Sequence, residues 1–352
     1  FTDEKSNPFF HQIVYSSYAI TKYIIYLIFP YKLSAFHPYP NNESREFAPY
    51  LMVYLLTTIG LIFIFFRNFK KNKLIVFSIL FFIINLSLVL QLMPLRDFII
   101  ADRYIYIPSL AIFFLLAYYL NALLEKKKFN NIIYPAFSIY LIGMFALSYS
   151  HSNVWQNSIS LFTDVVEKYP ESSIGWNNKG LALHNAGKHK DAIHDYKKAI
   201  EYNRGSVFSY NNIGITYSAI GNHNEAIKYY NTAIKMRPDF PQALFNRADT
   251  YSKTGDFIKS IDDYTKYISL VPENPKAYIS RGIVKAKTGD FNAALPDLNQ
   301  AINIDKNNSE AYLNRGVIYL NLHNYNEAII DFNMTLKFRP NFDYALFNRG
   351  IA

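Results

Sequence analysis

Uncharged apolar runs dominate the first 150 residues of the chain, whereas the later residues alternate apolar and polar positions over short distances. A membrane-spanning helix needs about 20 predominantly apolar residues. The run at 13–29 is interrupted by Lys22 and by serine and threonine residues, which leaves two alternatives open, a span or a helix lying in the membrane interface. We predict spans at about 48–66, 74–93, 104–124 and 131–150.

Basic residues cluster in two of the connections between these runs. The segment RNFKKNK at 67–73 carries four positive charges, and EKKK at 125–128 carries three against one negative charge. Cytoplasmic loops of membrane proteins are enriched in Lys and Arg. We therefore expect both connections on the cytoplasmic side, and the loops at 30–47 and 94–103 on the opposite side. The fourth span then ends outside the cytoplasm, so the rest of the chain is predicted to be extracytoplasmic.

The net charge of +9 fits this interpretation. Residues 1–150 contain 13 basic and 7 acidic residues, and residues 151–352 contain 23 and 20. The basic excess thus lies beside the apolar runs, and no basic stripe with interleaved aromatic residues marks the second half. We expect an integral membrane protein of a bacterial inner membrane or an ER-like membrane, with the lipid bilayer as a partner and no nucleic-acid partner.

From residue 173 onward the sequence repeats itself every 34 residues. Five full repeats begin at residues 173, 207, 241, 275 and 309, and a sixth begins at 343. Large residues recur at Trp176, Tyr210, Leu244, Tyr278, Tyr312 and Leu346, and small ones at Gly180, Gly214, Ala248, Gly282, Gly316 and Gly350. A second column of small residues comprises Ala192, Ala226, Ser260, Ala294 and Ala328. Such a period over several columns predicts a helical repeat protein.

This pattern resembles the tetratricopeptide repeat (TPR). The resemblance implies two short antiparallel helices per repeat, stacked into a solenoid with a concave groove that serves as a binding surface. Residues 151–172 hold the registers of a second repeat helix, and we expect them to cap the array and join it to the last span. The predicted fold class is therefore all-α, with a polytopic transmembrane helix bundle at 1–150, this junction, and a TPR α-solenoid at 173–352.

Asparagine recurs at the sixth position of the repeats, with a single serine in the column. The column consists of Asn178, Asn212, Asn246, Ser280, Asn314 and Asn348. It resembles the asparagine ladder in the groove of TPR glycosyltransferases that modify proteins, and an amide can both donate to and accept from a polypeptide backbone. We predict that the five asparagines bind a protein or peptide in the groove. The alternative is that they bridge neighbouring repeats.

Two charged columns vary together along the array. Arg247 and Asp263 lie 16 residues apart, as do Arg281/Asp297, Arg315/Asp331 and Lys179/Asp195, and the second repeat replaces both members with Ile213 and Tyr229. Exchange of a charged pair for an apolar pair predicts contact between the two positions. The arginines are therefore expected to be structural rather than to form an anion site.

Evidence for a metal site or a catalytic centre is absent from the sequence. There is no cysteine, and no dinucleotide-binding, P-loop, zinc-protease or hydrolase-nucleophile motif. His184, His189 and His194 are spaced by five residues and cross a turn at Gly187, so they do not share one helix face. We predict no metal site.

Three motifs in the first half resemble one further family. Asn7-Pro8 precedes an aromatic-rich apolar segment, Pro30-x-x-Leu33-Ser34 follows it, and Asp102-Arg103-Tyr104-x-Tyr106-x-Pro108-Ser109 opens a span. With the repeats, they are similar to the TPR-containing O-mannosyltransferases of the endoplasmic reticulum and their bacterial relatives. These are multi-span glycosyltransferases of the GT-C fold that use a polyprenyl-phosphate-linked sugar. The resemblance implies that this chain is the C-terminal part of such a protein.

The same resemblance suggests where the donor binds. GT-C enzymes carry essential acidic residues in an early external loop, which we expect in a missing N-terminal part, so no catalytic residue is assigned here. Arg96 and Arg103 lie in a predicted external connection and are predicted to bind the phosphate of the lipid carrier, because a guanidinium group binds phosphate through two hydrogen bonds. The alternative is that Asp102 and Arg103 pair with each other and anchor a helix end.

Two function hypotheses from different classes follow. The first is the C-terminal part of a membrane glycosyltransferase that takes a polyprenyl-phosphate-linked sugar as donor and binds protein or peptide acceptors through an extracytoplasmic TPR domain. The second is a membrane-anchored TPR scaffold for protein–protein interaction without chemistry of its own.

Overall fold

The structure is a computed structural model that describes residues 8–30, 33–37, 49–87, 90, 100–125 and 130–352. All regular secondary structure within these residues is helical, as predicted. The chain forms two compact units, one of Phe1–Ala186 with Lys197–Arg204 and one of Gly187–Tyr196 with Gly205–Ala352. The division at residues 150 and 172 remains a prediction from the sequence.

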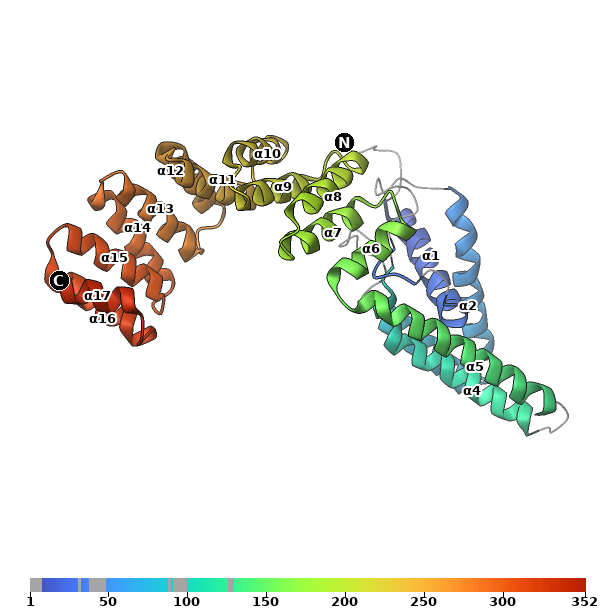
Figure 1. Cartoon of the computed structure of the whole chain (residues 1–352). Helices are drawn as coiled ribbons and strands as arrows, with labels where there is room; N and C mark the ends of the chain where they lie inside the picture. Colours follow the sequence, from blue (N-terminus) through green and yellow to red (C-terminus); the bar gives the residue numbers. More distant parts are fainter. Residues whose placement is uncertain (1–7, 31–32, 38–48, 88–89, 91–99, 126–129) are drawn as a thin grey trace. The chain divides into compact units, whose positions relative to one another are not determined.

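The apolar helices all belong to the first unit (Figure 1). Its elements up to the first repeat are α1 (Pro8–Ile28), η1 (Pro49–Tyr54), α2 (Leu55–Asn68), α3 (Lys73–Ser87), η2 (Asp102–Ile105), α4 (Tyr106–Leu124), α5 (Asn130–Ser152), η3 (Asn153–Trp155) and α6 (Ser158–Lys168). Helix α3 packs against α2 and α4, and α1 packs against η1 and α2. Tyr23, Leu51 and Leu86 are fully buried at the centre of this packing.

Three helices are long and apolar enough to cross a membrane, namely Tyr50–Asn68, Tyr106–Leu124 and Asn131–Trp155. They coincide with three of the predicted spans. In the predicted span at 74–93, α3 is described as far as Ser87, and residues 88–89 and 91–93 lie outside the described residues. Helix α1 covers the run at 13–29 and is not among the three, so its two alternatives remain open.

Apolar side chains on these helices face outward. On α5, Ile139, Ile142 and Phe145 expose 70, 68 and 72% of their surface, and α2 and α4 expose comparable rows. Apolar patches of this size on a water-soluble protein would favour aggregation, whereas lipid chains would solvate them.

The junction helix α6 packs against connections from the first half of the chain. Val165 lies in a buried cluster with Ala35, Phe36 and Ala101, and the Lys168 ammonium donates to the Leu33 carbonyl at 2.6 Å. Asn157 caps the start of α6 by accepting from the Ser160 N–H at 2.9 Å. Helix α6 also packs against the first repeat helix, α7, and its capping role remains a prediction.

The repeats form the remaining helices, two per repeat as predicted. These are α7 (Ser173–Asn185), α8 (His189–Tyr202), α9 (Val207–Ala219), α10 (His223–Met236), α11 (Pro241–Thr254), α12 (Phe257–Leu270), α13 (Pro275–Lys287), α14 (Phe291–Ile304), α15 (Ser309–Asn321), α16 (Tyr325–Phe338) and α17 (Asp343–Ile351). Helices α11, α13 and α15 each pack against their own second helix and against the second helix of the preceding repeat, while α9 packs against α10 and α17 against α16.

A left-handed residue separates the two helices of every full repeat. Gly187, Gly221, Gly255 and Gly289 have φ between 75° and 86°, and His323 takes the equivalent place with φ of 61°. Glycine adopts this conformation without the clash that a Cβ causes. Four of the repeats thus use a glycine for the left-handed conformation of this turn, and the fifth adopts it with the side chain of His323 present.

The first small-residue column marks the closest helix contact. A Cβ on Gly214 would lie 2.5 Å from Cε1 of Tyr230, and one on Gly316 would lie 2.8 Å from Cε1 of Phe332. Both rings are almost completely buried. These glycines therefore admit a large aromatic ring from the second helix of the same repeat.

Candidate functional site

The first helices of the repeats form one continuous side of the second unit. Helices α9, α11, α13 and α15 contact one another in succession. Within this unit, successive second helices do not pack together in this way. Stacked pairs that meet along one helix layer curve toward that layer, so the first helices line the inner face.

The predicted asparagine column lies on this layer but does not form a uniform ladder. Asn246 donates to the Oδ1 of Asn211 in the preceding repeat at 3.0 Å. Asn314 donates instead to the Glu310 carbonyl of its own helix at 2.8 Å, and Asn348 donates to the Tyr344 carbonyl at 2.6 Å. Asn178 belongs to the first unit, and the other four asparagines belong to the second.

Burial separates the members of the column further. Asn348 is 7% exposed, whereas Asn178, Asn212, Asn246 and Asn314 are half-buried. The hydrogen bond from Asn246 to Asn211 bridges two neighbouring repeats, which is the alternative to ligand binding that the sequence left open. This bond uses one N–H of the Asn246 amide. An amide has two N–H groups and an acceptor oxygen, so Asn246 retains groups for a ligand. Ligand binding by the column remains a prediction.

A pocket of about 220 Å³ opens beside Asn314. It lies between α13, the start of α14, and α15, and its lining residues are Ile283, Ala286, Lys287, Phe291, Asn314, Val317, Ile318 and Asn321. Most of the lining is apolar. Sequence reasoning missed this pocket, although apolar residues at the ninth position of both repeats, Ile283 and Val317, are visible in the sequence.

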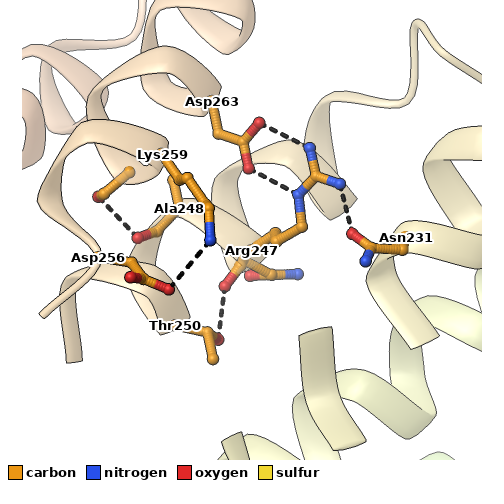
Figure 2. A network of polar contacts seen from close by, with 9 residues as sticks. Asn231, Arg247, Ala248, Thr250, Asp256, Lys259 and Asp263 are labelled. Carbon is orange, nitrogen blue, oxygen red and sulfur yellow. Dashed lines mark hydrogen bonds and ion pairs between the residues drawn. The ribbon is translucent and has the colours of Figure 1, made fainter. Parts of the chain in front are cut away.

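The charged columns form a ladder of ion pairs along the second unit. Arg247 donates from Nε and Nη2 to the two oxygens of Asp263, each at 2.7 Å, and from Nη1 to Asn231 of the preceding repeat at 2.5 Å (Figure 2). The same arrangement recurs in Arg281 with Asp297 and Thr265, and in Arg315 with Asp331 and Asn299. The predicted contact is thus confirmed in three repeats.

Each arginine therefore joins three helices of two repeats. Asp263 and Asp331 are 3 and 1% exposed, so these are buried pairs. Burial raises the pKa of the Asp331 carboxyl, and the hydrogen bonds from Arg315 oppose that rise. The same bonds raise the pKa of Arg315. Because the charges are compensated within the fold, these arginines do not offer an anion site.

Sequence reasoning found the Arg–Asp pairs but missed the third partner. Asn231, Thr265, Asn299 and Asn333 lie 16 residues before their arginines, at one repeat position. The regular spacing is a signal that could have identified them. Arg349 shows the same link, with Nη1 donating to Asn333 at 2.8 Å.

The predicted lipid-phosphate site cannot be built from the structure. Arg96 and the side chain of Arg103 lie outside the described residues. The described neighbour Ala101 is held by Tyr23, whose hydroxyl accepts from the Ala101 N–H at 3.2 Å. The role of both arginines remains a prediction.

Family comparison agrees with the helical repeats. Residues 171–239, 211–275 and 309–342 match models described as tetratricopeptide repeat, and residues 285–323 match one described as TPR repeat. These segments are tetratricopeptide repeats. TPR domains in general bind peptides or proteins, and the TPR array of this chain, residues 173–352, has the first-helix layer that such binding uses.

Among curated proteins, the chain is similar to Protein O-mannosyl-transferase Tmtc2 of Drosophila melanogaster. The identity is 26% over 106 residues, which cover 30% of this chain and 11% of that relative. The match thus spans about one tenth of the relative's length. It supports the predicted family only loosely.

Solved structures of TPR proteins are similar to about half of this chain. YrrB, described as a TPR protein with an unusual peptide-binding site, is 20% identical with a TM-score of 0.46, over 54% of this chain and 97% of its own. MamA from Desulfovibrio magneticus RS-1 is 13% identical with a TM-score of 0.46, over 49 and 97%. PilF of Pseudomonas aeruginosa is 14% identical with a TM-score of 0.47, over 51 and 82%.

Proposed function

We propose that this chain is part of a membrane glycosyltransferase whose TPR array binds an extended polypeptide acceptor on its extracytoplasmic side. The observation that carries the proposal is the presence in one chain of three span-length apolar helices and a TPR array. The similarity to an O-mannosyltransferase and the motifs around Asp102-Arg103-Tyr104 support the enzyme class. The donor would be a polyprenyl-phosphate-linked sugar.

The junction supports an extracytoplasmic array. Helix α6 packs against Ala35, Phe36 and Ala101 and donates to the Leu33 carbonyl, and these residues belong to the connections predicted to lie outside the cytoplasm. The basic connection at 67–73 lies at the other end of α2 and α3. The junction helix that precedes the array is thus attached to the membrane region on the side opposite the basic connection.

Cysteine labelling tests this topology directly, because the chain contains no cysteine of its own. Lys306→Cys, at an exposed turn of the array, is expected to react with a membrane-impermeant maleimide in intact cells. Lys70→Cys, in the basic connection, is the matched control and is expected to react only after the membrane is permeabilised. The opposite pattern for the two variants would place the array in the cytoplasm and remove the proposed function.

Arg103 is proposed to hold the phosphate of the lipid carrier together with Arg96. In the full-length protein, Arg103→Ala is expected to lower sugar transfer at least tenfold, since a charge-assisted bond to phosphate contributes about 1.5–3 kcal/mol. Arg103→Lys retains the charge and is expected to retain part of the activity. If Asp102→Asn has the same effect as Arg103→Ala, the two residues act as a helix anchor instead, and the phosphate role is excluded.

A further inference from the structure

The pocket between α13 and α15 has the size and lining of a side-chain subsite. Its volume of about 220 Å³ is below the ~300–1,000 Å³ that clefts for whole small molecules occupy. Ile283, Phe291, Val317 and Ile318 provide apolar walls from three helices. A single apolar side chain of a bound polypeptide fits these walls.

Two amides at the pocket have unused acceptors. Asn314 donates to the Glu310 carbonyl at 2.8 Å, and Asn321 donates to the Val317 carbonyl at 2.7 Å. Each bond fixes the amide on its own helix. In the second unit, which is described throughout, no donor reaches the Oδ1 of either residue. Both oxygens are therefore able to accept from the backbone N–H groups of a ligand.

The charge beside the pocket is positive. Helix α13 contains Lys276, Arg281, Lys285 and Lys287 and no acidic residue. Arg281 and Lys285 both pair with Asp297, whose one negative charge offsets only one of the two positive charges. Lys276 lies over the Phe245 ring at 5.7 Å, and Lys287 reaches the Ser252 hydroxyl at 3.5 Å, so neither forms an ion pair in the second unit.

No ion pair joins Lys287 to an acidic residue of the second unit. Asp290 accepts from the Ala293 N–H at 2.9 Å and caps α14. Asp249 pairs with Lys253 at 2.7 Å. Glu310 lies in the first turn of α15, and its carboxylate forms no ion pair in this unit. The cationic side of the pocket is thus complementary to an acidic ligand.

We infer that this pocket binds an apolar side chain of an extended polypeptide segment, next to an aspartate or glutamate that contacts Lys287. This inference rests on the proposed polypeptide binding and names the chemistry that the array selects. A segment with a basic residue at the same place would be repelled, and one with alanine in place of the apolar residue would leave the walls unfilled.

Defined peptides test the inference on the full chain in lipid nanodiscs. A mixed dodecapeptide library is selected for binding, and a selected peptide is remade in three forms, unchanged, with the apolar residue changed to Ala, and with the acidic residue changed to Lys. We expect each changed form to bind at least tenfold more weakly. Val317→Trp, which fills the pocket, is expected to weaken the unchanged peptide and to leave the Ala form unaffected.

A charge reversal at Lys287 distinguishes binding in this pocket from polypeptide binding elsewhere on the array. Lys287→Glu is expected to favour the Lys form of the peptide over the acidic form, which a merely structural role would not produce. If peptides bind but neither Val317→Trp nor Lys287→Glu alters the preference, the pocket is excluded and binding elsewhere on the array stands. If no peptide of the library binds wild-type protein, the proposed polypeptide binding itself fails.

Discussion

Asp263→Ala is expected to lower the free energy of unfolding of the neighbouring repeats by about 3–5 kcal/mol, because it leaves Arg247 partly buried without its carboxylate. Both oxygens of Asp263 accept from Arg247, whose side chain is only 15% exposed. Hydrogen exchange of peptides from α11 and α12 measures the loss locally. Asp262→Ala removes the exposed carboxylate next in sequence and is expected to change exchange little.

A double substitution tests whether an uncharged pair can replace the ion pair of Arg247 and Asp263. The second repeat places Ile213 and Tyr229 where the third has Arg247 and Asp263, and Ile213 is fully buried. Arg247→Ile combined with Asp263→Tyr is therefore expected to recover much of the stability lost in Asp263→Ala, since an apolar pair leaves no buried charge. Full stability in the single variant Asp263→Ala would contradict the ladder of ion pairs.

Gly214→Ala is expected to destabilise the second repeat by about 1–3 kcal/mol or more, as overpacking of a tight core does. The added Cβ would lie 2.5 and 2.7 Å from Cε1 and Cδ1 of Tyr230, whose ring is 1% exposed and has no room to move aside. Hydrogen exchange in α9 and α10, measured at increasing urea concentration, gives the unfolding midpoint that reports this loss of stability. Retention of the wild-type midpoint would show that the helices do not approach as closely as described.

Gly350→Ala provides the matched control from the same repeat column. A Cβ at Gly350 meets nothing within 4 Å. Alanine is about 1 kcal/mol better than glycine within a helix, so this variant is expected to be neutral or slightly stabilising. Gly214→Ala is expected to lower the stability, and Gly350→Ala is expected to keep or raise it. The difference between them measures the cost of the steric clash separately from the gain in helix propensity.

The repeat helices could be predicted from the sequence because several columns agree over five periods. The small residue at Gly214 and the paired changes at Arg247 and Asp263 each imply a specific contact, and both contacts are present. The third bond, to Asn231, was missed because an exposed polar residue on a helix is ordinarily solvated. Its partner becomes visible only when neighbouring repeats are stacked.

The sequence located the candidate site on the first helices of the repeats, but it could not predict the hydrogen bonds that its side chains form. Repeat position put the asparagines on the first helices, while side-chain rotamers decide whether an amide turns to its own helix, as Asn314 does, or to the next repeat, as Asn246 does. The pocket beside Asn314 requires three helices and a volume, which no single column encodes. In the first half of the chain, the predicted spans at 48–66, 104–124 and 131–150 coincide with helices that are long and apolar enough to cross a membrane.

Polypeptide binding by the asparagine column is the central claim, and removing three amides tests it. Asn212, Asn246 and Asn314 are changed together to Ala in the full chain, and the affinity for a library-selected peptide is measured by fluorescence polarisation. Each lost bond is worth about 0.5–1.5 kcal/mol, so affinity is expected to fall at least tenfold. The temperature is kept well below the unfolding midpoint, since Asn246→Ala also leaves the buried Asn211 without its bond.

The matched control removes three amides from the second helices instead. Asn224, Asn292 and Asn326 are exposed and share one repeat position, and their joint change to Ala is expected to leave the affinity unchanged. A tenfold or larger loss in the first triple variant, with the control unchanged and both arrays folded, is the result that this account predicts. Equal affinity in the two triple variants would contradict it and assign the asparagine column to the packing of the repeats.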